Sequence, residues 1–405
     1  MIPLKDKRIR IGGWWSGDPK LVSEEYVKKI AGTGADFIMT GQMNNTDTIK
    51  ALLSYCDKYG IECVVYDTRI YDNDQVDIGA LTKEYSGYKS YVGNMVKDEP
   101  GVEEYAHVRS VYDKFRKETP GKDAYINLLP MYASAAQLKY GAGVQAIDYY
   151  DTPNTTYGEH LDEYCKQFDT PYICVDVYPC RTAEDGTRTM YPGYLENLSQ
   201  MAYFCRKYDR EFWVMVQTLV WYKGAVPPTE TDLRWQFFTI LSFGAKAVFH
   251  YCLATPPGHT PGLVDAEGKE GPLYYPAQRI HAYLKAIEDV YYEYKNVGAF
   301  NVNYKEGYEF LGFEDQYKDF DTIEEVISDD QLLIGCFDKE KGNGHAFTIV
   351  NMTHLKDNKT AHAKLKIKGK KVTAYAENMT YVLGEVDGYY DITLPCGEGL
   401  FITVE

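Results

Sequence analysis

FWVMVQTL at residues 212–219 and AVFHYC at residues 247–252 frame a segment that opens with TETD at 229–232. Both apolar runs are rich in β-branched and aromatic residues, so each predicts a strand. Thr229 and Asp232 are residue types that cap the first turn of a helix. The stretch therefore predicts one strand–helix–strand unit.

The same unit recurs from Arg8 to about Lys295, where short apolar runs alternate with segments whose apolar residues lie three and four apart. The candidate strands are Ile9–Trp15, Phe37–Gly41, Glu62–Asp67, Tyr91–Lys97, Ala124–Leu129, Tyr172–Tyr178, Phe212–Leu219 and Ala247–Cys252. Eight alternating units predict an α/β fold of the (β/α)8 TIM barrel type over residues 1–296.

After about Asn296 the pattern changes to short strands separated by turn signals. Leu332–Phe337 and Ala346–Val350 flank a glycine-containing connection, which indicates a hairpin. The further candidate strands are Ala363–Ile367, Val372–Ala376, Tyr381–Val386, Tyr390–Leu394 and Leu400–Val404. We expect a C-terminal antiparallel β-sandwich over residues 297–405 that packs directly on the barrel, because no low-complexity linker separates the two.

The charge balance narrows the class of partner. With 59 acidic and 43 basic side chains the net charge is −16, which disfavours contact with nucleic acid or an anionic membrane. No run of about 18 apolar residues occurs. We therefore expect a carbohydrate or other small substrate, and leave the oligomeric state open.

The expected compartment follows from the cysteines and the first residues. Nine scattered cysteines with no CxxC pair favour a reducing environment, and Met1–Arg10 lacks the apolar core of a signal peptide. We expect a cytoplasmic protein, or a secreted one if a signal peptide has been removed. No cofactor is indicated, and His250, His259 and Asp67 have no spacing that favours a metal.

In a TIM barrel the active site lies at the C-terminal ends of the strands, so the polar and aromatic residues there are the site candidates. Carboxylates, amides and aromatic faces together suit a polyhydroxylated ligand. The candidate substrate-binding residues are Trp14, Trp15, Gln42, Asp67, Asn127, Tyr132, Asp176, Tyr178, Gln217, Trp221 and His250.

The segment Lys97-Asp98-Glu99-Pro100 is the sharpest local signal for chemistry. Two neighbouring carboxylates repel each other, so one of them keeps its proton near neutral pH and serves as a general acid. Asp98 and Glu99 are therefore the candidate catalytic residues. In the alternative interpretation Asp98 only caps the following helix and Glu99 is solvated beside it.

Retaining glycosidases with two carboxylates often place the nucleophile on the seventh strand, where this sequence has Gln217. An amide cannot serve as that nucleophile. Two catalytic routes remain: an inverting mechanism with Glu99 as acid and Asp176 as base, or attack by the 2-acetamido group of the substrate itself. A barrel that binds sugars without turnover is the non-enzymatic alternative.

Asp98-Glu99-Pro100 resembles the acidic pair of the β-N-acetylgalactosaminidases of glycoside hydrolase family 123 and their uncharacterised relatives. The stretch Gly271-Pro-Leu-Tyr-Tyr-Pro276 is similar as well, and the resemblance spans roughly residues 91–295. It implies an exo-acting N-acetylhexosaminidase in which Asp98 orients the acetamido group and Glu99 is the acid/base. Tyr132 or Tyr178 would bond the acetamido oxygen, while the sugar and its linkage stay open.

Overall fold

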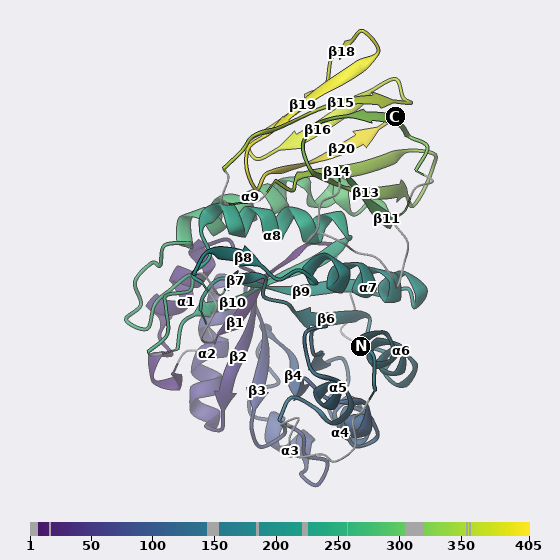
Figure 1. Ribbon diagram of the computed structural model, residues 1–405. Coiled ribbons are helices and arrows are strands. Elements are labelled where there is room, and N and C mark those ends of the chain that lie inside the picture. Colours follow the sequence, from purple (N-terminus) through teal and green to yellow (C-terminus); the bar gives the residue numbers. More distant parts are fainter. Residues whose placement is uncertain are drawn as a thin grey trace.

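A computed structural model describes residues 7–15, 18–143, 154–183, 186–220, 226–256, 258–303, 317, 320–353, 355 and 358–405. The chain forms a barrel and a smaller β-structure stacked on one side of it (Figure 1). None of the helices in these ranges has the length and apolar character needed to span a bilayer.

Eight parallel strands form the barrel in the order β5-β4-β3-β2-β1-β10-β9-β6. Their bounds are β1 Arg10–Trp15, β2 Phe37–Met43, β3 Glu62–Asp67, β4 Tyr91–Asp98, β5 Asp123–Asn127, β6 Tyr172–Asp176, β9 Glu211–Gln217 and β10 Ala245–Ala254. The ring closes between β5 and β6, where the Leu128 amide donates to the Cys174 carbonyl at 2.9 Å and Leu128 pairs in parallel with Val175. The expected TIM barrel is confirmed, and each of the eight candidate strands coincides with one of these.

Helices surround the ring, and capping residues set where several of them begin and end. Their bounds are η1 Pro19–Leu21, α1 Glu24–Gly32, α2 Thr46–Tyr59, α3 Ile78–Thr82, η2 Val102–Glu104, α4 Tyr105–Glu118, α5 Ala135–Tyr140, α6 Tyr157–Gln167, α7 Tyr194–Lys207, α8 Glu230–Ser242 and α9 Tyr274–Tyr291. The cap expected from Thr229 and Asp232 is confirmed, because the Asp232 amide donates to Thr229 Oγ1 and the Thr229 amide to Asp232 Oδ2. Gly60 ends α2 in the left-handed conformation that glycine tolerates best.

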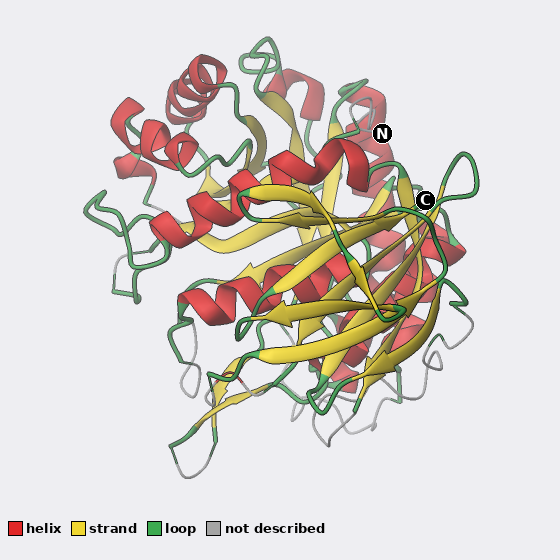
Figure 2. Ribbon diagram, turned by 90° about the horizontal axis from the view of Figure 1, so that it is seen from above, coloured by secondary structure: helices red, strands yellow, loops and turns green. Residues whose placement is uncertain are grey.

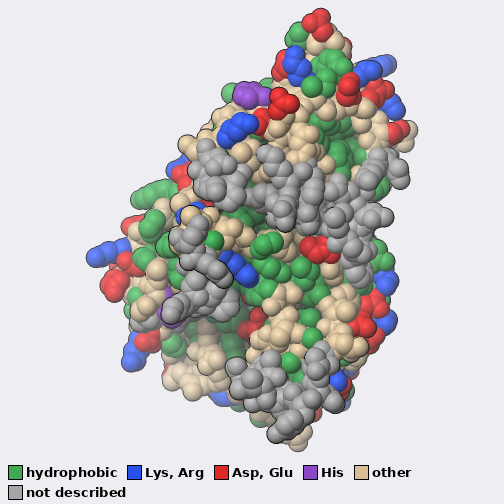
Figure 3. Space-filling view, viewed as in Figure 1, with side chains coloured by type: hydrophobic (Ala, Val, Ile, Leu, Met, Phe, Trp, Pro, Cys, Tyr) green, Lys and Arg blue, Asp and Glu red, His purple; other side chains and the backbone are tan. Residues whose placement is uncertain are grey.

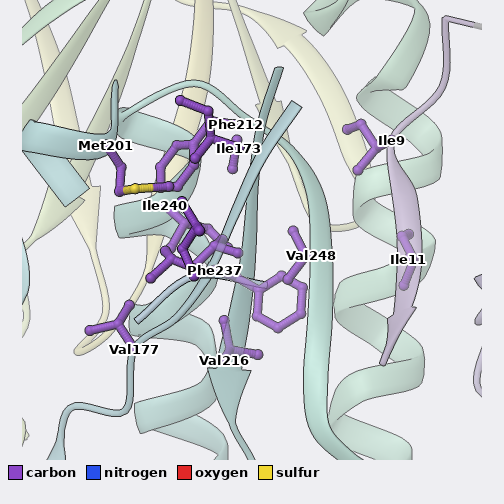
Figure 4. Packing of buried hydrophobic residues seen from close by; sticks show 14 of the residues in the cluster. Ile9, Ile11, Ile173, Val177, Met201, Phe212, Val216, Phe237, Ile240 and Val248 are labelled. Carbon is purple, nitrogen blue, oxygen red and sulfur yellow. The ribbon is translucent and has the colours of Figure 1, made fainter. Parts of the chain in front are cut away.

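Barrel strands are apolar on both faces. One set of side chains fills the lumen, among them Met95, Tyr125 and Trp213, and the alternating set packs outward against the helices. Figure 4 shows part of the outer layer, with Phe237 of α8 beside Val216 of β9.

The C-terminal part is a β-sandwich, as expected. Its larger sheet has the order β11-β13-β14-β20-β16-β17 and its smaller sheet the order β12-β15-β19-β18, with antiparallel neighbours throughout. The bounds are β11 Tyr294–Val302, β12 Ile323–Ile327, β13 Leu332–Lys339, β14 His345–Asn351, β15 Ala361–Ile367, β16 Val372–Ala376, β17 Met379–Val382, β18 Glu385–Val386, β19 Tyr389–Leu394 and β20 Gly399–Val404.

Two details of the sandwich differ from expectation. The single strand expected at Tyr381–Val386 is wrong, because the chain turns there and contributes β17 to one sheet and β18 to the other. The expected division between residues 296 and 297 falls inside β11, which pairs with β13. Burial in β15 alternates, so its polar side chains face water, and the surface of the sandwich carries acidic and basic groups side by side (Figure 3).

The sandwich rests on α8 and α9 (Figures 1 and 2). Thr348 Oγ1 donates to Ser242 Oγ at 2.7 Å, and Arg234 of α8 binds Glu377 and Glu398 at 2.7 and 3.0 Å. Because the barrel covers one side of α8 and the sandwich the other, this helix is buried almost all round. The expected direct packing of the two parts is confirmed.

Candidate active site

A bulge near the end of β4 aims Asp98 into the barrel. The register against β5 shifts between Met95, which points into the lumen, and Lys97. Val96 packs in the outer core, and the Lys97 ammonium binds Asp72 at 2.7 Å outside the lumen. Because Val96 and Lys97 both point outward, the next side chain, Asp98, points into the lumen.

Glu99 has an unusual backbone conformation, with a φ of +47°. This left-handed region is costly for a residue with a side chain, by about 1–3 kcal/mol, and occurs most often at functional sites. Two hydrogen bonds hold it: the Glu99 amide donates to the Asn127 carbonyl at 2.9 Å, and the Ala142 amide donates to the Glu99 carbonyl at 3.1 Å. The interpretation of Asp98 as a helix cap is wrong, because Gly101 is the N-cap of η2 and its amide is bonded by Glu104.

Asp98, Glu99 and Asp176 form one cluster of carboxyl groups at the barrel mouth. The Glu99 and Asp176 carboxyl groups are close enough to interact, and the interaction raises the pKa of Glu99. Asn127, at the end of β5, donates from Nδ2 to Asp176 Oδ1 at 2.8 Å and lowers the pKa of the nearby Asp98. The paired acids of the sequence are therefore part of a group of three, supported by one buried amide.

Burial raises the pKa of all three acids, and repulsion by neighbouring carboxylates adds to the rise for Asp98 and Glu99. The pKa of Glu99 rises to about 10, through burial first and then through Asp176 and Asp98. The pKa of Asp98 rises to about 7 through burial and the Asp176 charge, and that of Asp176 to about 6 through burial, which hydrogen bonds from Asn127 and Tyr178 oppose. Near neutral pH the cluster thus holds a proton on Glu99, while Asp98 is poised between its two forms.

Aromatic rings line the mouth. The Tyr66 and Tyr71 rings stack at 4.5 Å, and the Trp14 ring meets Tyr66 edge-on at 6.1 Å. Tyr251 of the neighbouring strand β10, which pairs with Trp14, has its ring 5.3 Å from that of Tyr178. Such faces pack against the C–H surfaces of a sugar ring.

Polar groups complete the lining of the mouth, and two of their atoms have no hydrogen-bond partner. The Tyr132 hydroxyl and Asn127 Oδ1 are buried and have no hydrogen-bond partner. Burial and the charges of Asp176 and Glu99 raise the pKa of Tyr132, so its hydroxyl stays a donor. Gln42 is exposed and reaches the Tyr66 hydroxyl at 3.5 Å. A polar substrate would satisfy this buried donor and this buried acceptor, which lie beside the three acids.

The structure thus brings together most of the candidate residues at the mouth. They are Trp14, Gln42, Asp98, Glu99, Asn127, Tyr132, Asp176 and Tyr178.

Four other candidates lie outside the mouth. Trp15 is fully buried in the outer core beside Tyr26, and Asp67 is fully buried and accepts from the Tyr85 hydroxyl at 3.0 Å. The His250 ring faces α9, where its Nε2 lies 2.7 Å from that of His281.

Gln217 is fully buried and has a structural task. Its Oε1 accepts from the Cys180 amide at 2.8 Å and its Nε2 donates to the Leu219 carbonyl at 3.2 Å. It therefore ties the end of β9 to the chain that follows β6. Trp221 lies outside the described residues.

Some residues of the mouth carry no clear sequence signal. Tyr66 follows from counting two residues on from lumen-facing Val64, once the inward face of β3 is known, whereas Tyr71 lies in the loop after that strand. Arg181 and Tyr191 come from a hairpin of β7 (Cys180–Thr182) and β8 (Arg188–Met190) in the connection after β6, which no sequence pattern indicated.

Among the residues that the structure describes, no group of three or more His, Cys, Asp or Glu side chains is arranged to hold a metal ion.

No protein-family model matches the sequence, and no curated protein matches it. Solved structures share the fold at low identity. A glycoside hydrolase family 5 protein from Bacteroides vulgatus is 11% identical with a TM-score of 0.58, over 98% of this chain and 89% of that one. Alpha-galactosidase I from Mortierella vinacea is 9% identical with a TM-score of 0.53, over 100% and 98%.

A third similar structure is larger than this chain. Beta-galactosidase from the psychrophilic Marinomonas ef1 is 10% identical with a TM-score of 0.52, and the match covers 71% of this chain. The chain spans 62% of the length of that enzyme. At these identities the likeness establishes the barrel fold, and all three matched proteins carry glycosidase names.

Proposed function

We propose that the protein is an exo-acting glycoside hydrolase that removes a terminal N-acetylhexosamine by substrate-assisted, retaining catalysis. The observation that carries the proposal is the cluster at the mouth, in which Glu99 holds a proton beside Asp98 and Asp176. The glycosidase names of similarly folded proteins and the likeness of Asp98-Glu99-Pro100 to family 123 support it.

In the first step Glu99 gives its proton to the glycosidic oxygen as the bond to the anomeric carbon breaks. The carbonyl oxygen of the 2-acetamido group attacks that carbon and forms a cyclic oxazolinium intermediate. Asp98, as a carboxylate, accepts a hydrogen bond from the acetamido N–H and stabilises the positive charge that develops on the ring. In the second step Glu99, now ionised, takes a proton from water, whose oxygen opens the intermediate with net retention.

Asn127 and Tyr132 have positioning roles in this scheme. Asn127 holds Asp176 by its amide group and lies close enough to Asp98 to lower its pKa. The Tyr132 hydroxyl is a donor without a partner near the same carboxylates, which suits a hydrogen bond to the acetamido oxygen. The open oxygen of Asn127 would accept from a sugar hydroxyl.

The geometry favours this route over the inverting one. An inverting pair needs carboxyl groups about 6.5–9.5 Å apart, with a water between them. Here the Glu99 and Asp176 carboxyl groups are close enough to shift each other's pKa, which supports a shorter separation. At the end of β9, where a second carboxylate would act as nucleophile, Gln217 is buried and bonded to backbone.

A set of 4-nitrophenyl glycosides tests the proposal, each N-acetylhexosaminide being matched with the hexoside that has a 2-hydroxyl group. We expect hydrolysis of the acetamido sugars, lost in Asp98→Asn and in Glu99→Gln and kept in Glu103→Gln, which alters a nearby exposed acid. Hydrolysis of only the 2-hydroxy sugars would reject substrate assistance. Binding of glycans without any hydrolysis would reject the enzyme.

A further inference from the structure

The β7–β8 hairpin places a cation at the rim of the mouth. In this hairpin Arg181 pairs with Thr189, and the Gln217 side chain holds Cys180 at its base. The Arg181 guanidinium carbon lies 5.1 Å from the centre of the Tyr132 ring and 4.3 Å from that of Tyr191. The guanidinium carbon therefore lies within cation–π distance of both tyrosine rings, which meet edge-on at 5.4 Å.

Arg181 lacks the partner that its neighbour has. Arg188, on the other strand of the hairpin, binds the Asp232 carboxylate and the Pro227 carbonyl. In the part of the chain that the structure describes, Arg181 forms no ion pair with a carboxylate, and its buried Nε has no hydrogen-bond partner. A guanidinium that stacks on aromatic rings keeps its edges available for bidentate bonds.

Arg181 is also not the counter-ion of the catalytic acids. The pKa of Asp98 responds to Asp176, Asn127 and Lys97, and that of Glu99 to the two aspartates. The Arg181 charge acts instead on Tyr132 and Tyr191. The mouth thus has three acidic groups at its centre and, on the far side of Tyr132, one basic group, the Arg181 guanidinium.

We propose that Arg181 binds an anionic substituent of the substrate, a sulfate ester or a carboxylate carried by the terminal sugar or by the residue next to it. The inference rests on the proposed function, since it names the substrate class of the same site. The Tyr132 hydroxyl would bond the acetamido group of the ligand, and the Tyr132 ring would support Arg181, which binds the anionic substituent. Such a site selects charged over neutral N-acetylhexosamine glycans, because an uncharged substrate leaves the guanidinium without a partner.

Calorimetric binding of monosaccharides tests the inference without any need for turnover. The probes are N-acetylglucosamine and N-acetylgalactosamine, their 6-sulfates, glucuronate and galacturonate, each titrated into the wild-type protein. We expect at least one anionic sugar to bind about tenfold more tightly than its neutral counterpart, and the preference to shrink with added salt. The sulfate and carboxylate arms identify the substituent.

Variants assign the preference to the residue. Arg181→Met should reduce the anionic-to-neutral ratio to near one, Arg181→Lys should retain part of it, and Arg109→Met, which removes an exposed charge on α4, should leave it unchanged. Equal binding of charged and neutral sugars, no binding of any of them, or a preference that survives in Arg181→Met would overturn the inference. Hydrolysis of neutral N-acetylhexosaminides without such a preference would reject this inference alone, whereas an anionic preference without hydrolysis would reject the proposed enzyme.

Discussion

Both ends of the barrel bury acidic groups, but at the N-terminal end each acid bonds to hydroxyl or indole groups, whereas at the mouth three acids crowd together around one amide. At the N-terminal end Asp123 accepts from the Tyr172 hydroxyl near Arg10, and Glu211 accepts from Trp213 Nε1 at 2.9 Å and from the Tyr292 hydroxyl at 3.2 Å. At the mouth three acids interact with one another, namely Asp98, Glu99 and Asp176. The nearby Lys97 ammonium forms ion pairs with Asp72 and Glu104 instead.

The contrast separates a structural use of charge from a chemical one. At the N-terminal end the acids bond to neutral hydroxyl and indole groups that fix the strands, and Arg10 Nε and Nη1 are buried without a hydrogen-bond partner. Mutually repelling acids at the mouth cost stability, but they hold a proton where a substrate can take it. In such barrels chemistry resides at the C-terminal ends of the strands, and this chain divides its acids in that way.

The largest expected effect is at the mouth. Glu99→Gln and Asp98→Asn should each lower kcat/KM for an N-acetylhexosaminide by about 10²–10⁴-fold, because one removes the transferable proton and the other the carboxylate that supports the acetamido group. Circular dichroism should show native folding of both variants. A loss of less than about tenfold in either would remove that residue from the mechanism.

A matched change at the other end should have the opposite signature. Asp123→Ala leaves the Tyr172 hydroxyl without an acceptor and should lower the free energy of unfolding by about 2–3 kcal/mol, measured by urea denaturation. Asp113→Ala, on the exposed face of α4, is the control. The folded Asp123→Ala protein should keep its kcat/KM; a large loss of activity per folded molecule would mean that the two ends are coupled.

The pH profile sharpens the picture of the mouth. For the wild type kcat/KM should rise as Asp98 ionises near pH 7 and fall as Glu99 loses its proton near pH 10. Asp176→Asn removes a negative charge that raises both pKa values, so both limbs should move to lower pH. Unmoved limbs would show that Asp176 is not coupled to the pair.

The smallest effect concerns stability. The folded protein raises the pKa of Glu99 from 4.5 to about 10, so the folded state holds a proton that the unfolded state releases above about pH 4.5. The contribution of this group is complete below pH 4.5 and is lost as pH rises toward 10. Glutamine cannot ionise, so the Tm of Glu99→Gln minus that of the wild type should grow steadily between pH 5 and pH 9 in calorimetry, because only the wild type loses stability over that range. A constant difference would argue that Glu99 is already ionised at neutral pH.

Much of the fold follows from local sequence patterns. The direction in which an individual side chain of a barrel strand points does not. Repeated apolar runs and helix caps predicted all eight barrel strands, because each unit is specified by its own residues. A barrel strand is apolar on both faces, so the sequence cannot show which alternate set enters the lumen. Asp67 and His250 were assigned to the mouth for this reason, yet both face outward.

The site could be predicted in part. Asp98 and Glu99 follow a recognisable strand, and Asp176 with Tyr178 shares a face by simple alternation. The bulge before Lys97 and the hairpin that carries Arg181 depend on contacts between segments far apart in the sequence. Such features appear only when the chain is folded.

The most direct test of the central claim uses N-acetylhexosaminides whose acetyl group carries none, one, two or three fluorine atoms. Fluorine withdraws electrons from the carbonyl oxygen, so if that oxygen is the nucleophile, kcat/KM should fall steeply with each fluorine in the wild-type enzyme. The steep dependence should accompany a product of retained configuration in proton NMR. Rates that do not depend on fluorination, with an inverted product, would contradict substrate assistance and assign the second carboxylate role to Asp176.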